Sequence, residues 1–154
     1  AQLFGNKPEN FKKAAQLCVE LGFDGIDINT GCPEKNIQKQ GAGAMLIKNP
    51  ELTKEIVQAT VEGAGEIPVS LKTRIGYNKN EIDEWILFLL KIENLAALTV
   101  HLRTKKEMSL VDAHWELMPK IVEMKNDLNS EIILLGNGDV KTVAEVRQKV
   151  EGDL

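Results

Sequence analysis

The segment Gly31-Cys32-Pro33 places a thiol on a corner of the backbone, directly after a short apolar stretch. Glycine lets the chain turn sharply and proline fixes its exit, so the sulfur is held in a defined position. A free thiol is mostly protonated at neutral pH, and Cys32 is therefore a candidate proton donor. A nucleophilic role would need an activating base, and the sequence shows no Cys–His pairing. Burial of Cys32 as a small apolar residue is the alternative.

Charged or titratable side chains end two further apolar stretches. Lys72 closes residues 67–72, with Arg74 two positions later, and His101 closes residues 96–101. A lysine at such a place can stabilise negative charge on a ligand ring or phosphate, and a histidine can hydrogen-bond a cofactor or exchange a proton. The alternatives are a lysine that extends to water and a histidine whose hydrogen bonds all lie within the protein.

The run Asn137-Gly138-Asp139 follows the apolar residues 131–135 and precedes a helix that the sequence predicts from about Val140. Backbone amides next to a helix start can bind an anion, particularly where glycine leaves them accessible. Asp139 is alternatively the N-cap of that helix.

Four lysines fall in segments that follow predicted strands and are predicted to lie in loops: Lys35, Lys39, Lys105 and Lys106. They are placed to follow a phosphate backbone, although solvated loop lysines are the common case. Cys18 and Cys32 are too few for a four-ligand zinc site, and the sequence has no HExxH, GxSxG or P-loop motif. We therefore expect no metal.

Apolar strands that alternate with amphipathic helices predict parallel βαβ units. Each polar group above comes at the carboxyl end of a strand, the edge at which (β/α)₈ barrels carry their chemistry. An open doubly wound sheet is the alternative, but its three-glycine phosphate loop is absent. The sequence thus predicts an α/β fold, a partial TIM barrel of about five βα units, with strands at 1–5, 24–29, 67–72, 96–101 and 131–135 and helices at 7–21, 41–65, 80–93, 115–128 and from about 140.

Composition limits the other possibilities. The chain has 154 residues, 43% of them hydrophobic, and a net charge of −4, which suits one folded domain. A complete barrel typically needs about 250 residues. No apolar run approaches the roughly 18 residues of a membrane span, and the first residues do not form a signal peptide. We therefore expect a soluble, cytoplasmic protein without membrane contact.

Taken in order, these groups resemble the tRNA-dihydrouridine synthase family over essentially the whole chain. The run Asp-Ile-Asn-x-Gly-Cys-Pro is highly specific. The motifs that carry the resemblance are IDINTGCP at 26–33, GAGAML at 41–46, VSLKTRIG at 69–76, LTVHLRT at 98–104 and GNGDV at 136–140.

The resemblance implies a barrel that binds FMN and reduces the C5–C6 bond of uridine in tRNA, with NADPH as electron donor. By position it makes Cys32 the proton donor to the uracil ring. The implied flavin contacts are Gln2, Lys72, His101, Asn137, Gly138 and Asp139. The implied substrate contacts are Asn29, Lys35, Arg74, Arg103 and Lys105, with the two arginines facing either the RNA or the flavin.

The sequence departs from the family pattern at both ends and at one internal position. Residues 1–154 correspond to the central part of a single FMN-binding barrel domain, without the first strand, the last strands and the C-terminal helical domain. We therefore expect the isolated chain to bind FMN weakly or not at all and to be inactive. Within the His-Gly-Arg-Thr motif of the family, Leu102 replaces the glycine.

Two other functions remain open from the sequence. One is a related FMN barrel that acts on a free pyrimidine, of the dihydropyrimidine or dihydroorotate dehydrogenase type. The other is a non-catalytic truncated module. Lys35 and the pair Lys105-Lys106 favour RNA as the substrate.

Overall fold

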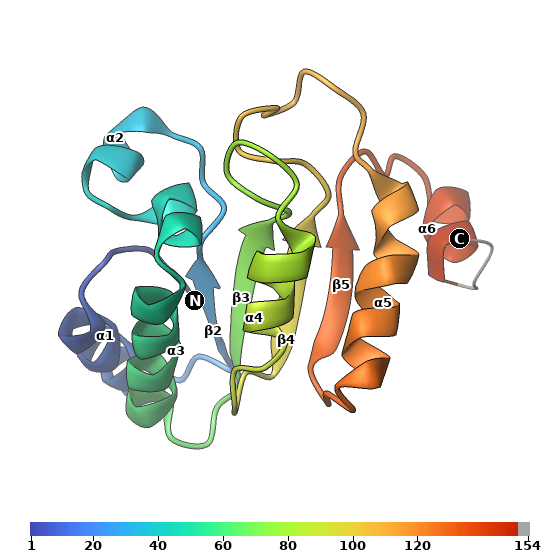
Figure 1. Ribbon diagram of the computed structural model, residues 1–154. Coiled ribbons are helices and arrows are strands. Elements are labelled where there is room, and N and C mark those ends of the chain that lie inside the picture. Colours follow the sequence, from blue (N-terminus) through green and yellow to red (C-terminus); the bar gives the residue numbers. More distant parts are fainter. Residues whose placement is uncertain (151–154) are drawn as a thin grey trace.

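The computed structural model describes residues 1–150 and contains a five-stranded parallel sheet in the order β1-β2-β3-β4-β5 (Figure 1). A sheet in which every strand pairs in parallel with its sequence neighbour is the arrangement of a barrel wall, whereas a doubly wound sheet reverses its strand order. The predicted fold class, a partial (β/α)₈ barrel, is confirmed. The strands are β1 (Gln2–Leu3), β2 (Ile26–Asn29), β3 (Val69–Arg74), β4 (Ala97–His101) and β5 (Ile133–Asn137).

Helices cover one face of this sheet. In Figure 1, α3 (Pro50–Ala64), α4 (Leu87–Leu89) and α5 (Met118–Asp127) stand in front of the strands, and α1 (Pro8–Glu20) packs beside α3. The short α2 (Lys35–Lys39) lies at the end to which the strand arrows point, and α6 (Val143–Val150) lies beyond β5. Short turns of other helix types complete the chain: η1 (Gly43–Lys48), η2 (Ile82–Ile86) and η3 (Trp115–Leu117).

The alternation of side chains along the strands separates an apolar face from a polar one. Ile28, Leu71 and Leu98 are fully buried in the core between the sheet and the helices. The residues between them point to the opposite face, because successive side chains of a strand alternate. On that face the strand register aligns Asn29 with Lys72, and it aligns Arg74 with His101 and Asn137.

Two predicted helices are wrong in extent. Residues 41–65 form η1 and then α3, because the side chain of Asn49 accepts a hydrogen bond from Leu52 N at 3.3 Å and Pro50 occupies the first helical position. The helix predicted at 80–93 ends at Leu89 and begins as the π-helical turn η2. Neither break disturbs the strands that position the polar residues.

Two shorter elements also differ from the prediction. Lys35 and Lys39, predicted in a loop, are the first and last residues of α2, whose start is capped by the side chain of Glu34. The last helix begins at Val143 rather than near 140, because Thr142 Oγ1 accepts a hydrogen bond from Glu145 N at 3.2 Å. The interpretation of Asp139 as its N-cap is therefore wrong.

Candidate functional site

Four polar residues predicted from the sequence each end a strand at the same edge of the sheet. Asn29, Arg74, His101 and Asn137 are the last residues of β2, β3, β4 and β5. Lys72 precedes the end of β3 by two residues, and Cys32 lies in the segment that follows β2. The arrowheads in Figure 1 mark this edge, which we call the rim.

The backbone around Cys32 is fixed by a side chain and by a neighbouring loop. Asn29 Oδ1 accepts hydrogen bonds from Gly31 N at 3.1 Å and from Cys32 N at 3.0 Å. Ala44 N donates to the carbonyl oxygen of Cys32 at 3.0 Å. Cys32 itself is only partly buried, unlike Cys18, which belongs to the core. We call residues 31–33, which these hydrogen bonds hold in place, the Cys32 loop.

Gly43 explains why the glycine-rich segment at residues 41–46 packs against this loop. Its φ is 59°, and a Cβ at this position would lie 2.8 Å from the carbonyl oxygen of Cys32. Both the backbone conformation and the close approach therefore require glycine. The glycine-rich motif at residues 41–46 is a weak phosphate-binding signal. In this structure it lets the backbone of Gly43 and Ala44 pack against Cys32.

Arg74 joins the Cys32 loop to the loop that follows β4. The residue is 8% exposed. Its Nε donates to the carbonyl oxygen of Gly31 at 2.8 Å. Its Nη1 donates to the carbonyl oxygens of Thr104 at 3.2 Å and Met108 at 3.3 Å. A contact of Arg74 with a substrate stays a prediction, and these bonds occupy its Nε and Nη1.

Arg103 makes a second connection of this kind. It is 6% exposed, its Nε donates to the carbonyl oxygen of Val111 at 2.7 Å, and its Nη2 forms an ion pair with Asp139. The same carboxylate oxygen of Asp139 accepts a hydrogen bond from Ala113 N at 2.7 Å. The hydrogen bond from Arg103 is the main cause that lowers the pKa of Asp139. The loop between β4 and η3 is thus tied to the segment after β5.

His101 is neutral at neutral pH. Its pKa is lowered to about 4, chiefly by burial and then by the charges of Arg74, Lys72 and Arg103, which outweigh the carboxylate of Asp139. Its Nε2 lies 3.2 Å from Nη1 of Arg103, which can only donate. This contact assigns the ring proton to Nδ1. His101 therefore retains one N–H donor.

Lys72 has no ion-pair partner within residues 1–150. Burial lowers the pKa of its ammonium, and Arg74 lowers it as well, whereas Asp27 and Cys32 raise it. Lys72 and Cys32 therefore influence each other's charge, and their grouping in one site stays a prediction. A half-buried cation without a paired carboxylate is suited to hold a ligand that carries negative charge.

A polar network behind Lys72 contains a residue that the sequence reasoning did not single out. Asp27 accepts hydrogen bonds from Gln2 Nε2 at 2.6 Å and from Ser70 Oγ at 2.7 Å. Gln2 Oε1 in turn accepts from Asn29 Nδ2 at 3.2 Å. The signal was the alternation Ile-Asp-Ile-Asn, which puts Asp27 and Asn29 on the same face of β2.

The segment after β5 lies against the ring of His101. Gly138 has a φ of 130°, and a Cβ at this position would lie 2.7 Å from Cβ of Ala113 and 3.2 Å from Cδ2 of His101. The side chain of Asn137 is exposed at the rim. Gly138 and Asn137 thus adjoin His101, and Asp139 is connected to it through Arg103. Gln2 bonds to Asn29 at the end of β2, and no contact joins it to His101 within residues 1–150.

Leu102 stands where the family pattern has glycine, and the structure accommodates its side chain. Its side chain is fully buried in the core, and its backbone has no positive φ that would favour glycine. Leu102 N donates to the carbonyl oxygen of Asn137 at 3.0 Å, which continues the pairing of β4 with β5.

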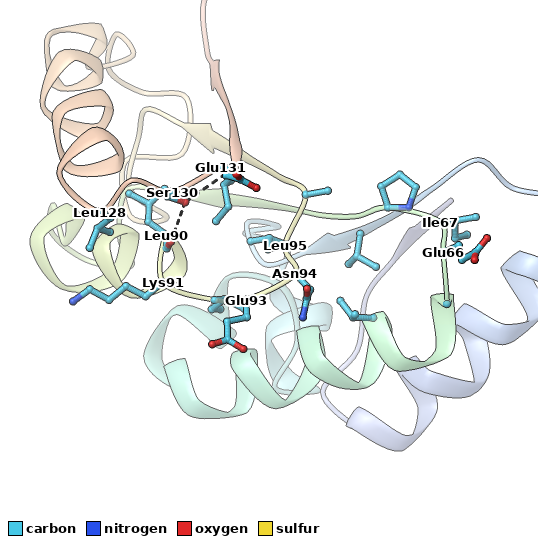
Figure 2. A pocket seen from close by; sticks show the side chains of 17 residues that line it. Glu66, Ile67, Leu90, Lys91, Glu93, Asn94, Leu95, Leu128, Ser130 and Glu131 are labelled. Atoms are coloured by element: carbon cyan, nitrogen blue, oxygen red, sulfur yellow. Dashed lines mark hydrogen bonds between the residues drawn. The ribbon is translucent and has the colours of Figure 1, made fainter.

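A hollow of ≈ 740 Å³ lies at the opposite end of the sheet, around the start of β3 and the segments that precede β4 and β5 (Figure 2). Ser130 Oγ donates to the carbonyl oxygen of Leu90 at 3.2 Å across it. In parallel barrels this end serves stability rather than chemistry. Within residues 1–150, no cluster of three His, Cys, Asp or Glu side chains is placed to hold a metal ion, and no helix has the length and apolarity to cross a membrane.

Comparisons with known proteins identify a family and several relatives of the chain. The family model described as "Dihydrouridine synthase (Dus)" matches residues 1–152. The chain is 45% identical over 154 residues to the "Probable tRNA-dihydrouridine synthase" of Staphylococcus aureus (strain Mu50), a match that covers 97% of this chain and 46% of that protein. It is 46% identical over 141 residues to the "Probable tRNA-dihydrouridine synthase 2" of Bacillus subtilis (strain 168), covering 91% of this chain and 42% of that protein.

The chain therefore spans less than half the length of these curated relatives. Its predicted position as the central part of a longer barrel domain, and its weak binding of FMN in isolation, stay predictions. The resemblance seen in the motifs around Cys32, Lys72 and His101 is confirmed by the family match over nearly all residues. The chain belongs to the dihydrouridine synthase family.

Proposed function

We propose that the protein reduces the C5–C6 bond of uridine in tRNA, with FMN as cofactor, NADPH as electron donor and Cys32 as the proton donor. Family membership supports the reaction class. The observation that supports the residue assignment is the Cys32 loop, whose backbone is held by Asn29 and which carries a partly buried thiol. Lys72, whose pKa the charge of Cys32 raises, has no ion-pair partner within residues 1–150. Because tRNA is the proposed substrate, we place the protein in the cytoplasm.

The donor set at the rim fits a flavin. The edge of its pyrimidine ring consists of carbonyl oxygens and ring nitrogens, which take hydrogen bonds from donors such as Lys72 Nζ and the Nδ1–H of His101. Lys72 has no carboxylate partner within the described residues, and His101 remains neutral. Gly138 keeps the backbone close to His101, where a Cβ would intrude. When bound, the flavin supplies the hydride that the reduction needs.

Cys32 completes the reduction. The hydride is delivered to C6 of uracil, and the electron pair of the C5–C6 double bond takes the proton of the Cys32 thiol at C5. The resulting thiolate regains a proton from water, so that one NADPH and one proton are consumed for each dihydrouridine formed. Lys72 stabilises the negative charge that develops on the uracil oxygen as the hydride arrives.

Asn29, Arg74 and Arg103 have supporting roles in this proposal. Asn29 holds the amides of Gly31 and Cys32, so the thiol keeps its orientation when a base enters. Arg74 and Arg103 hold the loop after β4 against the rim. A uridine in folded tRNA must leave its base stack to reach Cys32, which costs roughly a few kcal/mol. Contacts from Lys35 and Lys105 to the RNA offset part of this cost.

The test compares Cys32→Ala with Cys18→Ala in the full-length protein, because the isolated chain is expected to be inactive and contains only these two cysteines. Dihydrouridine in tRNA and reduction of bound flavin by NADPH are measured in parallel. We expect Cys32→Ala to lower dihydrouridine formation by about 10²–10⁴-fold while flavin reduction continues. Cys18→Ala should retain both activities. Dihydrouridine formation at the wild-type rate in Cys32→Ala would exclude Cys32 as the proton donor.

The choice of substrate is tested separately. Full-length wild-type protein is given tRNA, free uridine and free uracil at equal concentrations, and consumption of NADPH is followed. Reduction of tRNA alone supports the proposal. Reduction of the free pyrimidine at an equal or higher rate would instead indicate a pyrimidine dehydrogenase, and absence of flavin reduction with every substrate would indicate a non-catalytic module.

A further inference from the structure

Two lysines from different loops lie on the ring of one tyrosine at the rim. Nζ of Lys48 is 3.9 Å from the ring centre of Tyr77, and Nζ of Lys105 is 4.9 Å from the same centre. Tyr77 follows β3, Lys48 ends η1 and Lys105 follows β4. We call Tyr77, Lys48 and Lys105 the Tyr77 cluster. The loops after three successive strands therefore converge on one aromatic ring.

Main-chain hydrogen bonds hold this cluster together. Lys105 N donates to the carbonyl oxygen of Gly76, and Lys106 N donates to that of Tyr77, each at 2.9 Å. Tyr77 N donates to Oε2 of Glu81 at 2.6 Å, which fixes the backbone at Tyr77. The loops after β3 and β4 thus run side by side, and the position of the ring relative to the rim is fixed.

The cluster is also connected to the Cys32 loop. The hydroxyl group of Tyr77 donates to Gln38 Oε1 at 2.6 Å. Gln38 Nε2 donates to the carbonyl oxygen of Pro33, the residue after Cys32. A hydrogen-bonded path therefore runs from the tyrosine ring to the backbone next to the thiol. A ligand held on the cluster has a defined position relative to Cys32.

The charges of the cluster are not neutralised within the described residues. Neither Lys48 nor Lys105 takes part in an ion pair within residues 1–150. The chain as a whole carries a net charge of −4, so two cations gathered on one ring are a local excess of positive charge. An ammonium has three N–H donors, and contact with a ring face leaves donors free for an anion.

We propose that the Tyr77 cluster binds the sugar–phosphate backbone of the substrate RNA, next to the nucleotide that enters the site. This inference rests on the proposed function, which supplies RNA as the substrate. Lysine ammonium groups act as point charges toward phosphate oxygens. The tyrosine ring holds two of them at a fixed place, so the strand is positioned as well as attracted.

The test uses Lys48→Met, Lys105→Met and the double variant, with Lys91→Met as the matched control. Lys91 lies at the opposite end of the sheet, beside the hollow in Figure 2. Binding of an unmodified tRNA transcript to the full-length protein is measured over a range of salt concentrations. Each cluster variant should reduce the slope of log K against log salt by about 0.7–0.9, and the double variant by about twice as much. Lys91→Met should leave the slope unchanged.

The outcomes separate this inference from the proposed function. If the wild-type protein binds tRNA and the double variant matches Lys91→Met, the cluster is not a phosphate site, and the proposed function stands. If the wild-type protein binds no tRNA at any salt concentration, the RNA substrate itself is refuted. Polyglutamate that binds as tightly as tRNA, with binding lost in the double variant, would replace RNA with an acidic protein segment as the partner.

Discussion

The guanidinium group of Arg74 and the carbonyl oxygen of Gly31 are joined by a hydrogen bond of 2.8 Å that connects β3 to the Cys32 loop. Arg74→Met removes this bond and leaves buried carbonyl oxygens without a donor. We expect the free energy of unfolding to fall by about 1–3 kcal/mol. Dihydrouridine formation should fall while NADPH still reduces the flavin. Chemical denaturation and the two activity assays measure these effects.

Two further variants separate the geometry of Arg74 from its charge. Arg74→Lys keeps the charge but lacks the planar guanidinium group that donates to carbonyl oxygens in the loops after β2 and β4. Dihydrouridine formation in Arg74→Lys should therefore be as low as in Arg74→Met. Arg147→Met changes an exposed arginine of α6 and should alter the free energy of unfolding by less than about 0.5 kcal/mol. Full activity in Arg74→Met would show that the Cys32 loop does not depend on this arginine.

Gly43→Ala tests the contact between the glycine-rich segment and Cys32. Gly22 is the matched control, because it also has a positive φ, 76°, but nothing lies within 4 Å of a Cβ placed there. Alanine in the left-handed conformation should cost roughly 1–2 kcal/mol at either position. Only Gly43→Ala should also lower dihydrouridine formation, because its methyl group displaces the Cys32 carbonyl. Equal activities of the two variants would refute this role of Gly43.

The two histidines of the chain should titrate on opposite sides of the ordinary histidine pKa of 6.5. Burial and three nearby cations lower the pKa of His101 to about 4, whereas the hydrogen bond with Glu107 raises the pKa of His114. NMR of the imidazole C–H protons against pH measures both, and His114→Asn assigns the signals. A His101 signal that titrates at or above pH 6.5 would contradict the cationic surroundings described here.

These pKa shifts also set the sign of the pH dependence of stability. The unfolded chain binds a proton at His101 more readily than the folded chain does, so the stability linked to His101 is complete above pH 6.5 and is lost as the pH falls toward 4. The stability linked to His114 is complete below pH 6.5 and is lost as the pH rises through its raised pKa. The pH dependence of the free energy of unfolding should therefore weaken below pH 6.5 in His101→Asn and above pH 6.5 in His114→Asn. Chemical denaturation at a series of pH values measures both.

Leu102→Ala tests the departure from the family motif. The side chain is fully buried, so its truncation should lower the free energy of unfolding by about 2–5 kcal/mol. Leu110→Ala is the control, because Leu110 is 84% exposed in the same loop region and should change stability by less than about 0.5 kcal/mol. A neutral Leu102→Ala would show that the core tolerates glycine-sized residues at this position.

Much of the fold was predictable because it depends on local periodicity. Ile28, Leu71 and Leu98 alternate with polar residues, and parallel strands bring their carboxyl ends to one edge. This is why Lys72 and His101 could be grouped before any coordinates. The five-residue α2 was missed because one turn and a half is too short to show a helical period.

The roles of the arginines could not be read from the sequence. Arg74 donates to Gly31, which is 43 residues away, and Arg103 pairs with Asp139, which is 36 residues away. Their partners are largely main-chain oxygens, which every residue has, so no residue type marks them. The contact of His114 with Glu107 was equally invisible, because it depends on how the loop after β4 folds back.

None of the hydrogen bonds that hold the Cys32 loop within residues 1–150 involves the sulfur atom: they run between amides, carbonyl oxygens and the side chains of Asn29 and Arg74. The backbone conformation of the Cys32 loop therefore does not depend on the sulfur atom. Replacing the thiol of Cys32 with a hydroxyl or a selenol therefore changes the acidity of this group and removes none of these hydrogen bonds. A single substitution at position 32 can thus change the chemistry of this group while the loop keeps its conformation.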